Sequence, residues 1–259
     1  GAIMLKPHIS FSELKDWNFC PYYHNQVHFQ KVKGFRGNVF TAFGNAIHDT
    51  CEKTLTEDLK DPYGFFADRF VNVLNELKED GIEIDESLVE KMEMQAVPLI
   101  ENVLPALKDY FGEYEVHAAE EALYEDIEDA PQKYKGYIDL VLKTPDGKYH
   151  IIDWKTCSWG WDMRRKSDPM VTYQLTFYKY FWAKKHNVDL KDIETHFALM
   201  KRTAKKNHIE IFRVTSGDKK MSNALNFMNK ALYNINREMK IKNRLSCKRC
   251  DLYKTEHCK

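Results

Sequence analysis

The feature that most constrains this chain is a pair of apolar segments joined by the dipeptide Asp146-Gly147. Residues 134–143 before the turn and 148–155 after it draw their apolar side chains from Ile, Leu, Val, Tyr and Trp. An Asp-Gly dipeptide between two apolar runs is the strongest short-range signal for a β-hairpin. A turn centred there places Asp139 opposite Asp153 on the neighbouring strand.

Three charged side chains stand inside this otherwise apolar hairpin. Because side chains alternate along a strand, Asp153 and Lys155 lie on the same face. With Asp139 on the partner strand, two carboxylates and one ammonium group converge on one point. Unpaired carboxylates are costly in apolar surroundings, and a hard divalent cation with oxygen ligands removes that cost. The alternative is that Asp153 and Lys155 face solvent or form an ordinary ion pair.

The N-terminal half of the chain is helical in pattern. Ser10 and Glu13 have the spacing of a capping box that opens a short helix ending near Cys20-Pro21. A second helix is expected over residues 39–59. We interpret residues 61–113 as an inserted helical subdomain that shapes access to the site, with Pro98 and Pro105 marking kinks or breaks.

The C-terminal half alternates strands and helices. Besides the hairpin, strands are expected at residues 114–125, 193–201 and 208–214, and helices at 169–186 and 216–240. This order predicts an α/β fold with a mixed central β-sheet flanked by helices and the site at one edge of the sheet. A chain of 259 residues with 43% apolar content can bury a good core, so we expect one domain over residues 1–259.

Charge is distributed unevenly along the chain, although its net value is zero. Residues 201–259 hold 16 Lys and Arg against 5 Asp and Glu. A basic segment beside an acidic remainder favours a polyanionic partner such as DNA. The alternative is a solvated helix surface. The clusters expected to contact phosphates are Lys201-Arg202, Lys205-Lys206 and Lys240-Ile-Lys242-Asn-Arg244.

The loop after the hairpin interleaves aromatic and basic residues. Trp159 and Trp161 precede Arg164 and Arg165, and such residues serve stacking on unpaired bases and steering of phosphates. The alternative is a loop that two tryptophans pin to the core. No apolar run is long enough to span a bilayer and no signal-peptide pattern precedes the first helix, so we expect an intracellular, cytoplasmic protein without a membrane partner.

Four motifs occur in an order that resembles the RecB-type branch of the PD-(D/E)XK nuclease superfamily. They are a helix with a His, a Gly-x-x-Asp strand, an Asp-x-Lys strand and a helix with Gln-x-x-x-Tyr. The resemblance covers about residues 10–258 and implies a restriction-endonuclease-like core. The motifs read Gly44-Asn-Ala-Ile-His48, Gly136-Tyr-Ile-Asp139, Asp153-Trp-Lys155 and Gln174-Leu-Thr-Phe-Tyr178.

The resemblance implies roles for these residues. Asp139 and Asp153 would hold Mg²⁺ or Mn²⁺ together with the backbone carbonyl of residue 154, and His48 would be a further ligand that biases the site toward Mn²⁺. Lys155 would either help to deprotonate the attacking water or stabilise the pentacovalent phosphorus. Gln174 and Tyr178 would orient the lysine or the substrate phosphate, with Tyr178 as a simple core residue in the alternative. Glu120 or Glu121 occupies the position of a further carboxylate in the family.

Six cysteines divide into a C-terminal group and isolated residues. A Cys-x-x-Cys pair such as Cys247 and Cys250 is usually a zinc or redox site in an intracellular protein. The iron–sulfur branch of RecB-like nucleases, including the AddB type and CRISPR-associated exonucleases, has one cysteine before the nuclease core and three after it. By this resemblance Cys20, Cys247, Cys250 and Cys258 would hold a four-iron four-sulfur (4Fe–4S) cluster, and residues 247–258 would close on Cys20. Tetrahedral zinc is the alternative, with His257 as a competitor of Cys258. Cys51 and Cys157 have no partner by spacing and are expected to be buried.

The favoured hypothesis is a metal-dependent DNA nuclease. An exonuclease acting on single-stranded or end-processed DNA is expected, in recombination, repair or replication, with a helicase or recombination protein as partner. The rival hypothesis is a catalytically inactive, DNA-binding iron–sulfur module of a larger complex.

Overall fold

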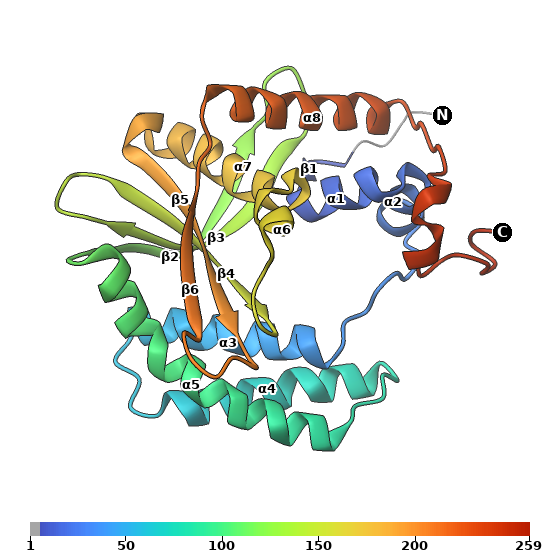
Figure 1. The fold of residues 1–259 in the computed structure, drawn as a ribbon. Helices are drawn as coiled ribbons and strands as arrows, with labels where there is room; N and C mark the ends of the chain where they lie inside the picture. The colour runs from blue at the N-terminus through green and yellow to red at the C-terminus, as the bar shows by residue number, and fades with distance from the viewer. Residues whose placement is uncertain (1–5) are drawn as a thin grey trace.

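The computed structural model describes residues 6–259 and shows a β-sheet between two helical layers (Figure 1). The described part of the sheet has six strands in the order β1-β3-β4-β5-β6, with β2 paired to the other side of β3. The neighbours β4 and β5 run parallel, and so do β1 and β3, whereas the remaining pairs are antiparallel. The strands are β1 His8–Ile9, β2 Glu115–Asp126, β3 Lys133–Lys143, β4 Tyr149–Cys157, β5 Ile193–Lys201 and β6 Ile209–Val214. The predicted α/β fold with a mixed sheet is therefore confirmed.

The central strands β3 and β4 pair over only part of their length. Their register joins Leu140 to Ile152 and continues toward the turn as far as Lys143 and Tyr149. Beyond Leu140, β3 pairs with β2 and, at its first residues, with β1, whereas β4 continues beside β5. The two strands therefore part in a fork, and the residues that come next on each strand lie at its opening.

One helical layer is formed by α3 (Val39–Thr56), α4 (Pro62–Glu79) and α5 (Glu86–Phe111). These helices lie below the sheet in Figure 1 and share one apolar core with it, which includes Leu140, Ile152 and Trp154. Asn38 begins α3 with a complete capping box. Within the described residues, the predicted helical insertion thus packs as a layer on the sheet, while its role in access to the site stays a prediction.

We expected Pro98 and Pro105 to mark kinks or breaks in this layer. A break was wrong, because α5 runs through both prolines. A proline lacks the N–H that would donate to the carbonyl four residues earlier. This carbonyl belongs to Met94 for Pro98 and to Glu101 for Pro105. Both of these residues are exposed, so solvent can reach their carbonyls. The Pro98 carbonyl accepts a hydrogen bond from Asn102 Nδ2 at 2.6 Å.

The opposite face of the sheet is covered by helices from both ends of the chain. This second core joins Ile138, Ile151 and Phe197 of the strands to buried residues of α1, α7 and α8. The helices of this side are α1 Phe11–Phe19, α2 Pro21–His28, α6 Met163–Ser167, α7 Pro169–His186 and α8 Asp218–Asn236, with short 3-10 turns η1 Leu190–Asp192 and η2 Arg244–Arg249. The predicted strands and long helices agree with these bounds within a few residues, whereas α2, α6 and β1 were not foreseen.

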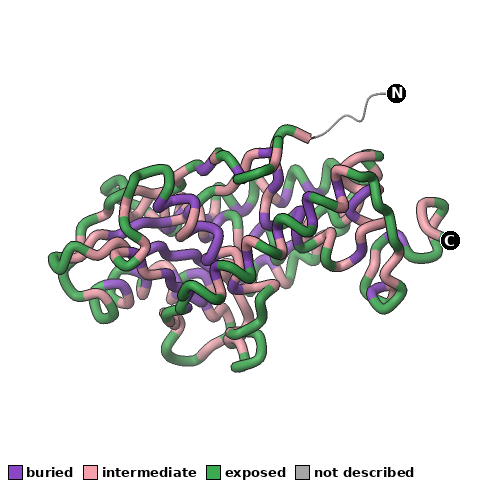
Figure 2. Tube along the Cα trace, turned by 90° about the horizontal axis from the view of Figure 1, so that it is seen from above, coloured by how far each residue is buried: buried purple, intermediate pink, exposed green. Residues whose placement is uncertain are grey.

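Buried residues concentrate on the strands and on the helices that cover them, whereas the segment leading to the C-terminus is mostly intermediate or exposed (Figure 2). At the other end of the chain, Ser10 Oγ accepts the Glu13 N–H, but the Glu13 carboxylate binds Lys6 and His24. The predicted capping box is therefore only half formed. Among residues 6–259, no helix is both long and apolar enough to cross a membrane.

Candidate active site

Asp139 and Asp153 are the first residues beyond the last pair that joins β3 to β4, so both lie at the opening of the fork. Asp139 Oδ2 accepts a hydrogen bond from the backbone N–H of Trp154 at 2.8 Å, which joins the two strands there. Both strands have neighbours on either side. The expectation of a site at one edge of the sheet was therefore wrong, because β5 and β6 extend the sheet beyond β4.

Asp153 and Lys155 share a face of β4, as strand alternation requires. Lys155 Nζ lies 2.9 Å from Asp153 Oδ2, and the Asp153 side chain is only 4% exposed. Lys155 therefore compensates the charge of Asp153. With two carboxylates and one ammonium group, the fork still carries an excess of negative charge when both aspartates are ionised, and a divalent cation would offset it.

The charge of Asp153 acts strongly on the carboxyl group of Asp139. Burial and the nearby charge of Asp153 raise the pKa of Asp139 well above its usual range, against the hydrogen bond from Trp154. Without a cation, the fork therefore favours a proton on Asp139 at pH values where an exposed aspartate is ionised. A divalent ion between them would allow both carboxylates to be charged.

Burial alone would lower the pKa of Lys155, but the charge of Asp153, the hydrogen bond to it and the charge of Asp139 together outweigh burial and raise this pKa. A lysine with a raised pKa stays protonated near neutral pH, so it is a poor base. Of the two roles predicted for Lys155, the stabilisation of negative charge on phosphate agrees with this direction.

His48 reaches the fork from α3. Its Nδ1 lies 3.9 Å from Asp139 Oδ1, and it makes a hydrogen bond with the backbone of Trp154. Burial lowers the pKa of His48 despite the neighbouring charge of Asp153, which favours the neutral imidazole that a metal requires. Gly44, one turn earlier, brings α3 close to β4, since a Cβ there would lie 3.1 Å from Thr156 Oγ1.

Gln174 and Tyr178 approach the fork from α7. Gln174 Nε2 donates to the Tyr178 hydroxyl at 3.3 Å, and the charges of Asp153 and Asp139 act on this hydroxyl. Gly136 makes room for the tyrosine, because a Cβ at Gly136 would lie 3.0 Å from Tyr178 Cε1 and 3.3 Å from Tyr134 Cε1. Tyr178 is thus both a buried core residue and a neighbour of the two carboxylates.

The two glutamates of β2 have separate surroundings. Glu121 lies on the α7 side, where it accepts hydrogen bonds from Trp182 Nε1 at 2.9 Å and pairs with Lys185 at 2.9 Å. Glu120 adopts a left-handed backbone conformation, with φ of 48°. Burial and the charges of Glu52, Asp49 and Asp153 raise the pKa of Glu120. Glu120 is therefore the glutamate whose charge interacts with the fork.

A hollow beside the fork is lined by three cationic side chains and an amide, and by no carboxylate. Lys155 and Gln174 belong to the predicted site, whereas Lys15 of α1 was missed. Within the described residues, neither Lys15 nor Arg165 has an acidic partner within ion-pair distance. Burial and the charges of Lys155 and Arg165 lower the pKa of Lys15. A lone lysine in a short polar helix gives no sequence signal for such a position.

The residues predicted to contact DNA have different environments. Trp159 is 79% exposed and can stack on a base, whereas Trp161 packs on Phe197, with ring centroids 5.2 Å apart. Trp161 is thus held against the core, as the alternative for this loop expects. Stacking of Trp159 on a base stays a prediction. Arg165 lies over the Trp161 ring, 4.7 Å from its centroid, while the neighbouring Arg164 is exposed.

Lys201 and Arg202 are engaged within the protein. Lys201 Nζ lies 3.6 Å from Glu210 Oε1. Arg202 donates from Nη1 to Gln95 Oε1 at 2.6 Å and from Nη2 to Ser158 Oγ at 3.3 Å. These contacts tie the end of β5 to α5 and to the loop after β4, so Arg202 in particular has a structural function.

The sequence matches the family described as the PD-(D/E)XK nuclease superfamily over residues 8–255. The chain belongs to this superfamily. No curated protein matches the chain. The name of the superfamily contains a (D/E)-x-Lys pattern, and Asp153-Trp154-Lys155 on β4 has this pattern.

Two solved structures resemble the nuclease. A protein from Eubacterium rectale described as a "Putative exonuclease" has a TM-score of 0.60 at 14% identity, over 94% of this chain and 91% of that chain. SSO0001 has a TM-score of 0.44 at 10% identity, over 97% and 86% of the two chains. The first likeness supports the fold, and at this identity it supports nothing further.

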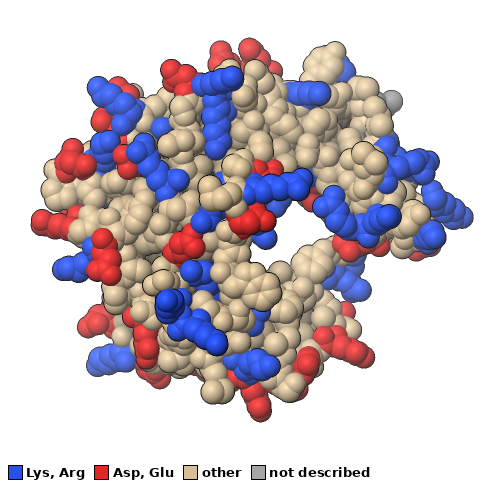
Figure 3. All heavy atoms as spheres, in the orientation of Figure 1, with Lys and Arg blue, Asp and Glu red and all other residues tan. Residues whose placement is uncertain are grey.

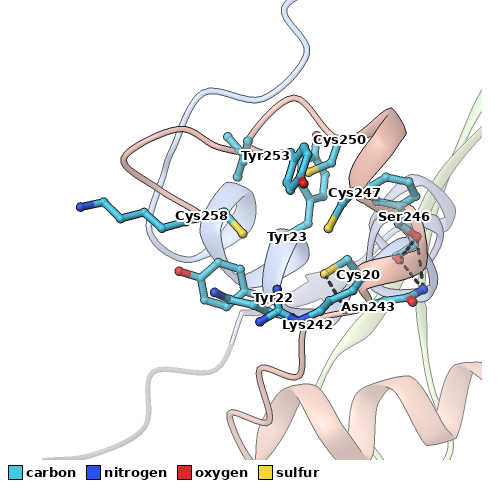
Figure 4. Close-up of a pocket in the computed structure, with 14 residues that line it drawn as sticks. Cys20, Tyr22, Tyr23, Lys242, Asn243, Ser246, Cys247, Cys250, Tyr253 and Cys258 are labelled. Carbon is cyan, nitrogen blue, oxygen red and sulfur yellow. Dashed lines mark hydrogen bonds between the residues drawn. The ribbon is translucent and has the colours of Figure 1, made fainter.

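Four cysteines of the nuclease line one pocket, although they come from both ends of the chain. Figure 4 shows Cys20 beside α2 and Cys247, Cys250 and Cys258 from the C-terminal segment. The backbone N–H of Asn243 donates to Cys20 Sγ at 3.2 Å. Cys51 is buried, as expected, whereas Cys157 is only half-buried.

Proposed function

We propose that this nuclease hydrolyses DNA phosphodiester bonds with Mg²⁺ or Mn²⁺. The observation that carries the proposal is the gathering of two carboxylates, Asp139 and Asp153, and the ammonium group of Lys155 in the fork. An inert scaffold has no physical need to bury the Asp139 carboxyl group beside the charge of Asp153.

His48, Asp139 and Asp153 fit the requirements of a divalent ion. They offer two carboxylates and an imidazole whose lowered pKa keeps it neutral. Their donor atoms do not all lie within 4.8 Å of one another, so binding one ion requires a side-chain rotation. The His48 side chain is 29% exposed and has room for it. When bound, the metal would neutralise charge on the scissile phosphate and lower the pKa of water.

The side chains around the metal have separate roles. Lys155, held charged by Asp153, stabilises negative charge that develops on the phosphate. The hydrogen bond from Trp154 fixes Asp139, so this carboxylate keeps its orientation when a substrate arrives. Gln174 positions the Tyr178 hydroxyl, and both limit the space beside Asp153.

The hollow lined by Lys15, Lys155 and Arg165 would receive a backbone phosphate next to the scissile one. Three cations without a lining carboxylate attract an anion, and Gln174 adds a neutral donor. Trp159 borders an adjoining hollow together with Arg165. A base stacked on this exposed tryptophan would be unpaired, which supports single-stranded DNA as substrate.

An opening through the molecule supports an exonuclease. In Figure 3 it passes between the side of α1 and α2 and the side of α3, with both basic and acidic side chains at its rim. Residues 29–38 connect α2 to α3 along one border of it (Figure 1). We infer that a strand enters this opening by a free end. The description of the Eubacterium rectale protein as a "Putative exonuclease" agrees with this inference.

Digestion of end-labelled single-stranded DNA with Mg²⁺ or Mn²⁺ tests the activity. The parent protein should degrade it, and Asp153→Asn and Lys155→Met should each lower the rate at least 100-fold. Unchanged activity in both variants would contradict the assignment. A circular single strand of the same sequence should resist digestion because it has no free end. Rapid cutting of the circle would show that the protein is an endonuclease and not an exonuclease.

We also propose that Cys20, Cys247, Cys250 and Cys258 hold a 4Fe–4S cluster. A zinc ion bonded to thiolates at about 2.3 Å would bring them to roughly 3.8 Å from one another. No three of the four sulfur atoms lie within 4.8 Å of one another. A side-chain rotation could bring the thiolates closer, so this spacing does not separate the two groups. The proposal is supported by the four cysteines lining one pocket from both ends of the chain, and the N–H donated to Cys20 Sγ is a kind of contact that tunes clusters. An intracellular role beside a helicase or recombination protein stays a prediction.

A further inference from the structure

A second group of candidate metal ligands lies near the start of β4 and β5, on the sheet face opposite Asp153. His150 is the register partner of Glu194, and His196 is two residues further along β5. Because alternate residues of a strand share a face, all three side chains point toward the α5 side of the sheet. The active site does not use them.

The donor atoms of this group have spacings that suit one ion. His150 Nδ1 lies 3.0 Å from His196 Nε2 and 3.6 Å from Glu194 Oε2. One donor atom from each residue can be chosen so that all three lie within 4.8 Å of one another. Tetrahedral zinc with bonds of about 2.0 to 2.1 Å separates its ligand atoms by roughly 3.4 Å. The two short distances bracket this value.

The outer ring nitrogens have the partners that ligating histidines require. His150 Nε2 lies 3.0 Å from Thr144 Oγ1, and His196 Nδ1 lies 3.2 Å from the Tyr110 hydroxyl. A histidine that binds a metal through one nitrogen normally donates its other N–H to an oxygen of this kind. His150 Nδ1 and His196 Nε2 then carry lone pairs that face each other, and a cation between them stabilises this arrangement.

Glu194 is oriented by its second oxygen. Lys148 Nζ lies 3.1 Å and Arg213 Nη1 lies 3.5 Å from Oε1, which leaves Oε2 beside His150. The two cations reduce the negative charge of the group and so disfavour Mg²⁺ or Ca²⁺, which depend on oxygen ligands. A metal that binds imidazole nitrogen strongly is affected less.

The group is enclosed by aromatic rings at the end of α5. Phe111 lies 4.9 Å from the ring centroid of His150 and 5.0 Å from that of His196. His196 is 1% exposed and His150 is 6% exposed. Burial lowers the pKa of both imidazoles, that of His196 to about 3, so both are neutral near pH 7, as metal ligands must be.

We propose that His150, Glu194 and His196 form a binding site for Zn²⁺ or a neighbouring late first-row divalent cation, with water as the fourth ligand and separate from the active site. The ion would replace the proton that the two imidazoles otherwise share and would fasten the end of α5 to β4 and β5. The proposal is independent of nuclease activity.

The test measures the zinc retained by the purified full chain after incubation with ZnCl₂ and gel filtration. Glu194→Gln keeps an oxygen for Lys148 and Arg213 but loses the charged ligand, so it should retain one zinc fewer per chain than the parent. Lys148→Met removes a neighbouring cation and no ligand, so it should bind zinc at least as tightly. Anomalous diffraction of a zinc-soaked crystal should place the ion between the two histidines.

Thermal unfolding provides a second readout. Zinc should raise the midpoint of the parent by several degrees more than that of Glu194→Gln, and in chelator both proteins should show the same circular dichroism. If Glu194→Gln misfolds, Thr144→Val replaces it and should weaken zinc binding about tenfold. Equal zinc content in the parent and the variant, or no anomalous peak between the histidines, would overturn the proposal in favour of a shared proton.

Discussion

The backbone N–H of Trp154 on β4 donates to Asp139 Oδ2 on β3 at 2.8 Å. This bond joins the two strands where their regular pairing ends. The fork thus holds Asp139 by a backbone hydrogen bond, whereas the ammonium group of Lys155 lies 2.9 Å from Asp153 Oδ2. The two aspartates are therefore held by different groups.

The first prediction concerns the pH dependence of stability without metal. The pKa of Asp139 is raised in the folded state, so its contribution to stability is complete below about pH 4 and is lost as pH rises through the folded pKa. Asp139→Asn keeps an oxygen for Trp154 and removes this titration. In chelator, the parent's free energy of unfolding should therefore fall with pH relative to the variant, by at most about 1.4 kcal/mol per pH unit.

Urea denaturation at several pH values between 4 and 8 measures this difference. Added Mn²⁺ should restore stability to the parent and leave Asp139→Asn unaffected, because binding to the folded state alone stabilises it. Parallel pH profiles for the two metal-free proteins would show that Asp139 ionises freely in the fork.

The second prediction concerns the basic hollow. Lys15→Ala and Arg165→Ala should each raise the KM for single-stranded DNA about tenfold, with a smaller change in kcat, because they remove phosphate contacts. The slope of log KM against log salt should fall by roughly 0.7 for each lost contact. Lys191→Ala, at an exposed lysine of η1 that lies outside the hollow and outside the predicted phosphate contacts, is the matched control. Equal KM values for Lys15→Ala and Lys191→Ala would remove Lys15 from the DNA path.

The third prediction concerns Gly136. A methyl group there would lie 3.0 Å from Tyr178 Cε1 and 3.3 Å from Tyr134 Cε1, and both rings are buried and unable to retreat. Gly136→Ala should therefore destabilise the protein by about 1 to 3 kcal/mol and displace Tyr178. In Gly44→Ala, the helix-forming gain of alanine offsets the single contact with Thr156, so its effect on urea unfolding should be smaller. A fully stable Gly136→Ala protein would contradict this packing.

The fourth prediction concerns the cysteine pocket. Anaerobically purified protein should be brown and contain iron and sulfide, and Cys250→Ser should lose both. Cys20→Ser should in addition lower the unfolding midpoint, because Cys20 joins α2 to the C-terminal segment through Asn243. Cys157→Ser lies outside the pocket and should keep its iron. Colourless parent protein with one bound zinc would rule out the cluster.

Local sequence signals were sufficient for the hairpin and its charges. The turn at Asp146-Gly147 sets the register, and the register brings Asp139 to Asp153, so no distant part of the chain is needed. The position of the site within the sheet could not be predicted in this way. It depends on β5 pairing beside β4, and β5 begins 46 residues after Gly147 of the turn.

Other features depend on contacts that sequence spacing does not encode. Trp159 and Trp161 differ only because Phe197, on a later strand, receives the second ring. Lys15 approaches Lys155 through the packing of α1 on the sheet. The prolines of α5 are tolerated because the carbonyls that they leave without a donor belong to exposed residues. In each case the role of the residue depends on its solvent exposure or on a residue that is distant in the sequence.

The most direct test of the account is the location of Mn²⁺ by anomalous diffraction in crystals of the parent and of Asp153→Asn. We expect one strong peak in the parent, within coordination distance of His48, Asp139 and Asp153, and its loss in the variant. A peak outside the fork, or an unchanged peak in Asp153→Asn, would contradict the claim that these strands part to hold a catalytic metal.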